Sequence, residues 1–158
     1  RFPEPSEDIK QEALFSSATE ILVRHDHPLV SDSDISLKHL STYPWVVPRS
    51  GTPTRLLFDS VFSAAGIEMP ERIVESGSHV LIRALLLGGD WMTMISEHQF
   101  QQELEIGLLA KIPYDLNHAA RPIGITMRKS WNPTGTQRVF LDLLREKAMP
   151  PGSEPSTR

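Results

Sequence analysis

Short apolar runs alternate along this chain with longer runs in which apolar residues recur at helical spacing. Strands are predicted over residues 20–24, 45–47, 72–75, 91–95, 108–112 and 123–127. Helical segments are predicted over 36–40, 52–66, 78–89, 97–107 and 134–146. Strands that alternate with helices favour an α/β protein with a largely parallel sheet.

The clearest helix begins at Thr52, a residue type that caps helix N-termini, and has Pro53 in its first turn. Gly66 supplies its stop. Its predicted apolar face comprises Leu57, Phe58, Val61, Phe62 and Ala65. The helix that follows Ser78 has apolar residues around most of its circumference, so we expect it to be deeply buried. Thr134 and Gln137 have the spacing of a capping box before the last helix.

Composition excludes several classes of function. The net charge of −4 lacks the basic footprint of a nucleic-acid-binding domain. The absence of cysteine removes disulfides, thiol catalysis and cysteine-based zinc sites. The longest aliphatic run, residues 84–87, is far too short for a membrane span, and the N-terminal residues lack the basic-then-apolar order of a signal peptide.

Charge is spread unevenly along the chain. Residues 1–120 hold 9 basic and 17 acidic residues, whereas residues 121–158 hold 7 basic and 3 acidic ones. We interpret the basic excess of the second part as a solvated face and tail. The acidic leader with Pro3 and Pro5, and the last nine residues with their three prolines, are expected to be extended or disordered.

Two strand-to-helix turns could bind a ligand, because in open α/β sheets ligands bind beyond the carboxyl ends of strands. The first, PRSGT at residues 48–52, precedes a helix N-terminus and adds the cations Arg49 and Arg55. This combination suits an anion such as a carboxylate. The second, ESGS at residues 75–78, offers serine hydroxyls. Ordinary helix capping also explains both turns, and from the residues alone it is the favoured interpretation, slightly for PRSGT and more clearly for ESGS.

Evidence for catalysis or for a metal is weak. His25 and His27 flank Asp26, a spacing that could hold a metal, but a solvated turn before a proline is more common. The sequence contains no HExxH, GxSxG, phosphate-binding-loop or dinucleotide-binding fingerprint. Trp91, Met92 and Met94 are interpreted as core residues. We therefore predict no catalytic residue, no metal and no cofactor.

Four segments together resemble the C-terminal effector-binding domain of LysR-type transcriptional regulators. They are ILVRHDHPL at 21–29, SLKHLSTYPWVVPRSGT at 36–52, VESGSHVLIRALLLGGDWMTMIS at 74–96 and RPIGITMRKSWNPTGTQRVFLDLLR at 121–145. Their order and spacing carry the resemblance, since none of the four is diagnostic alone. The ESGS and PIGITMR versions are most similar to members that answer to sugar-derived or aromatic acids.

The resemblance implies a fold like that of the type 2 periplasmic solute-binding proteins, with two α/β lobes and two crossing hinge strands. Residues 20–24 and 123–127 would be the crossing strands. The implied divisions are 1–19 as the end of the first lobe, 20–127 as the complete second lobe, 128–147 as a helix returning to the first lobe, and 148–158 as a disordered tail. The family's winged helix-turn-helix and the opening elements of its first lobe would lie outside this sequence.

Carried onto this chain, the resemblance implies an effector site formed by Pro48, Arg49, Ser50, Gly51 and Thr52, with Ser76 and Ser96 as further members. The expected effector is a small organic acid or sugar acid. The expected assembly is a homodimer or homotetramer in the cytoplasm that binds DNA only through the N-terminal domain. A solute-binding protein of a transport system and a small-molecule enzyme remain the alternatives.

Overall fold

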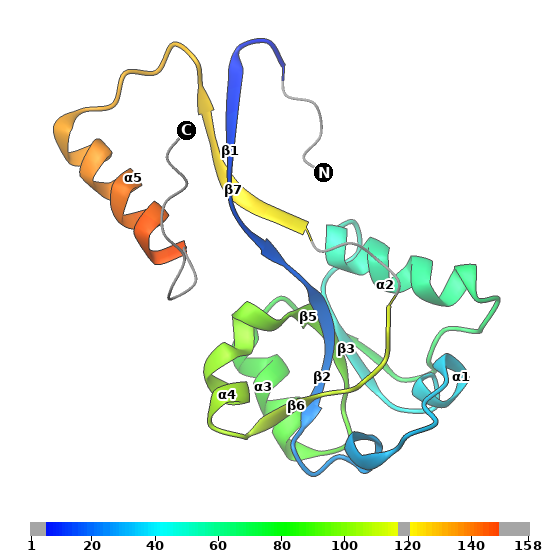
Figure 1. The fold of residues 1–158 in the computed structure, drawn as a ribbon. Helices are drawn as coiled ribbons and strands as arrows, with labels where there is room; N and C mark the ends of the chain where they lie inside the picture. Colours follow the sequence, from blue (N-terminus) through cyan, green and yellow to red (C-terminus); the bar gives the residue numbers. More distant parts are fainter. Residues whose placement is uncertain (1–5, 117–120, 149–158) are drawn as a thin grey trace. The chain divides into compact units, whose positions relative to one another are not determined.

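The computed structural model describes residues 6–116 and 121–148, which divide into two compact units. One unit contains the described residues up to Ser17 together with 121–148, and the other contains residues 18–116. Figure 1 shows the elements of both units along the chain. The predicted leader at 1–5 and the predicted tail after residue 148 lie outside the described residues.

The unit of residues 18–116 is built on a mixed sheet with the strand order β4-β3-β5-β2-β6. Its strands are β2 (Thr19–Arg24), β3 (Trp45–Val47), β4 (Ile73–Glu75), β5 (Thr93–Ser96) and β6 (Leu109–Lys111). β3 pairs in parallel with β4, and a parallel bridge from Trp45 to Met92 joins β3 to the start of β5. β2 runs antiparallel to both β5 and β6. The expectation of a largely parallel sheet is therefore wrong, because β2 lies inside the sheet and runs antiparallel to both of its neighbours.

Helices cover both faces of this sheet, which makes three layers (Figure 1). The helical segments are η1 (Pro28–Ser31), α1 (Leu37–Leu40), α2 (Pro53–Ala64), α3 (His79–Gly88), η2 (Glu97–Phe100) and α4 (Gln101–Glu105). One core joins Ile21, Val23, Trp45, Val47, Met92 and Met94 to Phe58 and Phe62 of α2. The other joins Leu22, Val46 and Ile95 to Ile82 and Leu86 of α3 and to Phe100. This division follows from the two-residue period of a strand, which sends successive side chains to opposite faces.

An aromatic cluster fixes α2 on its face of the sheet. The Trp45 ring centroid lies 5.0 Å from that of Phe58 and 6.1 Å from that of Phe62, and all three residues are fully buried. The Trp45 indole N–H donates to the Leu40 carbonyl at 3.0 Å, so its polar atom is satisfied. The predicted strand at 45–47 and the predicted apolar face of α2 are confirmed, except that Ala65 is exposed.

The expected deep burial of α3 is wrong. Its bounds agree with the prediction, and the Ser78 hydroxyl caps it by accepting from the Leu81 N–H. Only Ile82 and Leu86 are buried, however, whereas 80% of Val80 is exposed. The helix contacts the sheet along a single stripe, so the residues on its outer side are not covered by described parts of the chain.

The other unit consists of β1 (Ile9–Ser17), β7 (Arg121–Arg128) and α5 (Gly135–Ala148). β1, where we predicted no strand, pairs antiparallel with β7. A Cβ atom on Gly124 would lie 2.0 Å from the Glu12 carbonyl oxygen, so this crossing requires glycine. The strand predicted at 20–24 is confirmed as β2, which pairs with β5 and β6 in the sheet of residues 18–116 and not with β7.

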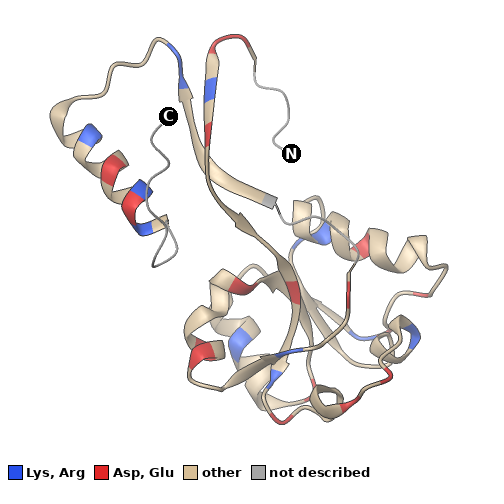
Figure 2. Ribbon diagram, in the orientation of Figure 1, with Lys and Arg blue, Asp and Glu red and all other residues tan. Residues whose placement is uncertain are grey.

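α5 is tied to β1 by charge. The Arg145 guanidinium donates to both carboxylate oxygens of Glu12, at 2.7 and 2.9 Å, and this pair lowers the pKa of the Glu12 carboxyl. The predicted capping box is confirmed, because Thr134 and Gln137 exchange backbone-to-side-chain hydrogen bonds. Figure 2 shows basic and acidic residues interleaved along this helix.

Candidate functional site

Three parallel strands of the sheet end at one edge, where all the predicted site residues lie. β3 ends at Val47 and leads into the turn at residues 48–52; β4 ends at Glu75, before Ser76; and β5 ends at Ser96 itself. The register pairs Trp45 with both Ile73 and Met92, so the three chains leave the sheet at nearly the same level. The structure therefore brings together residues up to 48 positions apart in sequence, from Pro48 to Ser96.

The order of the connections makes this edge a topological switch point. The chain leaves β3 toward β4 through α2, on one face of the sheet. It leaves β5 toward β6 through η2 and α4, on the other face. Where adjacent parallel strands send their connections to opposite sides, a crevice opens beyond the strand ends, and ligands of α/β proteins bind there.

The turn after β3 and the start of α2 contain backbone N–H groups that could bind a ligand. The Thr52 hydroxyl donates to the Arg49 carbonyl at 2.9 Å and accepts from the Arg55 N–H at 3.3 Å, which confirms the predicted cap. Gly51 has a φ of 82°, a left-handed conformation that favours glycine. Within the described residues, the backbone N–H groups of Ser50, Gly51 and Thr54 have no hydrogen-bond acceptor. Unpaired N–H groups at a helix N-terminus attract anions.

Arg49 in this turn and Arg55 in the first turns of α2 differ in whether their positive charge is paired with a carboxylate. Arg55, with 15% of its side chain exposed, pairs with Asp59 at 2.8 Å and with Glu75. Hydrogen bonds to Asp59, the larger cause, and to Glu75 raise the pKa of the Arg55 guanidinium. Arg49 is exposed, and its guanidinium has no partner among the described residues. Of the two cations predicted to attract an anion, only Arg49 is therefore free to do so.

Ser76 and Ser96 line the same edge in different ways. Ser76 is 8% exposed; its N–H donates to the Val47 carbonyl at 2.9 Å, and its hydroxyl accepts from the Ser78 N–H at 3.0 Å. The capping interpretation of the ESGS turn is thus confirmed for Ser78, whereas the Ser76 hydroxyl stabilises the turn just before the cap. Ser96 is half-buried at the end of β5, and its hydroxyl does not cap the following 3₁₀ turn.

His27 departs from the expected solvated turn. It is 2% exposed, and its Nδ1 accepts the Leu29 N–H at 3.2 Å, which caps η1. The ring packs against Tyr43 with centroids 4.8 Å apart. Desolvation by burial lowers the pKa of the His27 imidazole. Among the described residues no group of histidine and carboxylate side chains has the arrangement of a metal site.

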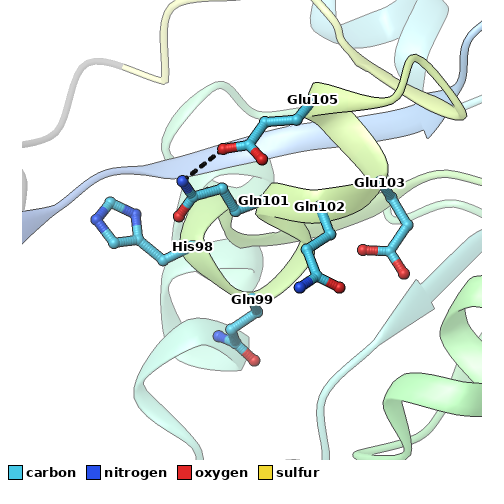
Figure 3. Close-up of a pocket in the computed structure, with 6 residues that line it drawn as sticks. All are labelled: His98, Gln99, Gln101, Gln102, Glu103 and Glu105. Carbon is cyan, nitrogen blue, oxygen red and sulfur yellow. Dashed lines mark hydrogen bonds between the residues drawn. The ribbon is translucent and has the colours of Figure 1, made fainter.

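A polar hollow of about 510 Å³ lies elsewhere on this unit, along η2 and α4 (Figure 3). Its lining residues are His98, Gln99, Gln101, Gln102, Glu103 and Glu105. Gln101 donates to Glu105 at 2.7 Å, and Glu103 pairs with Arg83 of α3. Because one helical segment supplies the whole lining, and its charged groups are engaged with neighbours, this surface is a solvated helix face rather than a second ligand site.

Comparison with known proteins supplies the family. The model of the LysR substrate binding domain matches residues 1–149. The transcriptional regulator GalR of Pseudomonas putida is 37% identical over 121 residues, which are 77% of this chain and 30% of GalR. The uncharacterized regulator YdcI of Escherichia coli is 26% identical over 148 residues, 94% of this chain and 48% of that protein. The chain thus spans less than half the length of either relative.

Solved structures agree on the fold. The regulatory domain of CcmR from Synechocystis, in complex with 2-PG, has a TM-score of 0.72 at 22% identity and covers 92% of this chain and 70% of its own. The effector binding domain of QuiR, in complex with shikimate, has a TM-score of 0.66 at 17% identity over 93% of this chain and 68% of its own. The fold is therefore that of type 2 periplasmic-binding-protein-like effector domains, as predicted.

These matches decide between the alternatives left open by the sequence. The matching family is that of LysR substrate binding domains, and the matched relatives named above are transcriptional regulators. No helix within the described residues is long and apolar enough to cross a membrane. The chain belongs to the LysR substrate-binding domain family.

Proposed function

We propose that this chain senses a small organic acid or sugar acid for a LysR-type regulator, and that the acid binds at the carboxyl edge of β3, β4 and β5. One observation supports this most directly. The free guanidinium of Arg49 lies on the turn that also carries two unpaired backbone N–H groups, with a third in the first turn of α2, at a topological switch point. A carboxylate satisfies both kinds of donor, and a single free cation matches a single carboxylate.

The site residues of this proposal are Pro48, Arg49, Ser50, Gly51 and Thr52, with Ser76 and Ser96 contributing from the neighbouring strand ends. Effector binding would shift the balance between two states of the regulator by its different affinity for each. The rest of the proposal concerns the whole regulator, which would act in the cytoplasm as a homodimer or homotetramer. It would bind DNA through an N-terminal domain that is not part of this sequence.

A thermal-shift screen of organic and sugar acids, followed by calorimetric titration, tests the proposal. Shikimate and its methyl ester form an informative pair within such a screen, because the ester lacks the charge that Arg49 would recognise. For any acid that binds, Arg49→Gln should weaken the affinity by about 10- to 100-fold, the loss of one charge-assisted hydrogen bond.

Arg83→Gln is the matched control, since Arg83 is an exposed arginine of α3 whose recorded partner is Glu103. It should leave the affinity unchanged. Equal affinities of the wild-type chain and the Arg49→Gln variant would remove this turn from the effector site.

A further inference from the structure

Arg55 makes three contacts that reach beyond its own helix turn. Its Nε donates to Asp59 at 2.8 Å, one helical turn along α2. One terminal nitrogen donates to the Glu75 carboxylate and lies 3.5 Å from the Pro48 carbonyl oxygen. The guanidinium therefore connects α2 to two other places in the unit.

Those two places are the turns that carry the proposed site. Pro48 begins the turn after β3, and Glu75 is the last residue of β4, next to Ser76. The two chains are joined by one backbone hydrogen bond near this level, from the Ser76 N–H to the Val47 carbonyl. The pairing of β3 with β4 ends at Val47 and Glu75. Past this point the Arg55 side chain links the two segments, through the Pro48 carbonyl and the Glu75 carboxylate.

The position of α2 itself depends on other groups. Phe58 and Phe62 anchor the helix by complete burial against Trp45, and Thr52 caps its first turn. Loss of the Arg55 side chain would leave these anchors intact. Without the Arg55 side chain, the distance between the turn after β3 and the end of β4 would no longer be fixed.

The charge of Arg55 is also already matched. Its two carboxylate partners lie within hydrogen-bonding distance, so binding an anionic ligand would require it to give up one of them. Arg49, which precedes the cap residue Thr52 in the sequence, has the unpaired charge. The two arginines therefore have separable roles.

Resting on the proposed function, we infer that Arg55 is a positioning residue: it clamps the turn after β3 to the end of β4, so that the donors of both turns are held for one ligand. It does not bind the ligand's charge. Its planar fork is essential to the clamp, because an ammonium group is a point charge that does not reproduce the two-sided contact.

Hydrogen exchange of the backbone amides in the 158-residue chain, without ligand, tests the clamp. In Arg55→Gln, the hydrogen-bonded amides of the two turns, those of Thr52, Ser76 and Ser78, should exchange about tenfold faster, the factor that corresponds to one lost charge-assisted hydrogen bond. Amides of the sheet should exchange as in the wild type. Arg55→Lys should behave like Arg55→Gln, and Glu75→Gln should accelerate the amides of Ser76 and Ser78 more than that of Thr52. Arg83→Gln, again the control, should change neither turn.

Two results would overturn the inference. Unchanged exchange at both turns in Arg55→Gln would mean that Arg55 does not clamp them. Faster exchange throughout residues 18–116, together with a lower denaturation midpoint, would mean that Arg55 serves the stability of the whole unit. Failure of every acid to bind the wild-type chain would reject the proposed function separately, because the exchange measurement requires no ligand.

Discussion

Burial of the His27 imidazole predicts a dependence of stability on pH that a single substitution should remove. Its Nδ1 accepts the Leu29 N–H, so the neutral ring carries its proton on Nε2, a buried atom without a hydrogen-bond partner among the described residues. A second proton would have to enter at Nδ1 and break the cap of η1. Desolvation is the largest cause that lowers the pKa of this group below its usual 6.5, ahead of opposing contributions from Asp90.

The sign follows from which state takes up the proton first. As the pH falls through 6.5, the unfolded chain protonates its histidine while the folded chain does not, so the free energy of unfolding decreases until the lower folded pKa is reached. Above 6.5 the full stability is present. For one proton the slope cannot exceed about 1.36 kcal/mol per pH unit. Between about pH 7.5 and about pH 5.5 the loss attributable to His27 is therefore at most about 1.4 kcal/mol.

Urea denaturation at these two pH values, for the wild type and for His27→Asn, measures the effect. Asparagine keeps an oxygen acceptor near the position of Nδ1 and does not titrate. The lowered pKa values of Glu12 and Asp26 affect stability only at lower pH, since their usual values are 4.5 and 3.8. The wild type should lose more stability than the variant on acidification. Parallel losses in the two proteins would refute the assignment of this pH dependence to His27.

Three further predictions concern stability. Thr52→Ala should lower the free energy of unfolding by about 1 kcal/mol in urea denaturation, because it removes the cap of α2. Leu86→Ala should cost about 2–5 kcal/mol and Leu87→Ala less than about 1 kcal/mol by the same measurement, because Leu86 is fully buried and Leu87 is 39% exposed on the same helix. Gly124→Ala should accelerate amide exchange along β1 and β7, because its Cβ would meet the Glu12 carbonyl oxygen.

Each of these predictions has a matched control. Thr52→Ser keeps the capping oxygen and should retain nearly all of the stability. Gly77→Ala adds a methyl group with no atom within 4 Å, so it should leave the exchange of β1 and β7 unchanged. Equal costs for Leu86→Ala and Leu87→Ala would contradict the one-sided packing of α3, and unchanged exchange in Gly124→Ala would contradict the close crossing of β1 and β7.

The sequence predicted the elements whose signals lie within a few neighbouring residues. Thr52, Pro53 and Gly66 bound α2 because capping and stopping are local hydrogen-bonding and conformational effects. The Thr134 and Gln137 capping box formed for the same reason. β1 was missed because its residues lack a clear apolar alternation, and it exists as a strand through its pairing with β7, more than 100 residues away.

The candidate site was also predicted in part from the sequence and in part only from the structure. Its members could be named from the strand-end rule and the resemblance, because both are read from contiguous segments. Only the tertiary structure decided which of its arginines is free, since one of the two carboxylate partners of Arg55 is Glu75, 20 residues further along the chain. It likewise decided that α3 is covered on one side and that His27 is buried. Caps and turns depend on neighbouring residues, whereas burial and charge pairing depend on residues distant in the chain. The sequence therefore determined where most elements begin and end, and the tertiary structure determined what each of them contacts.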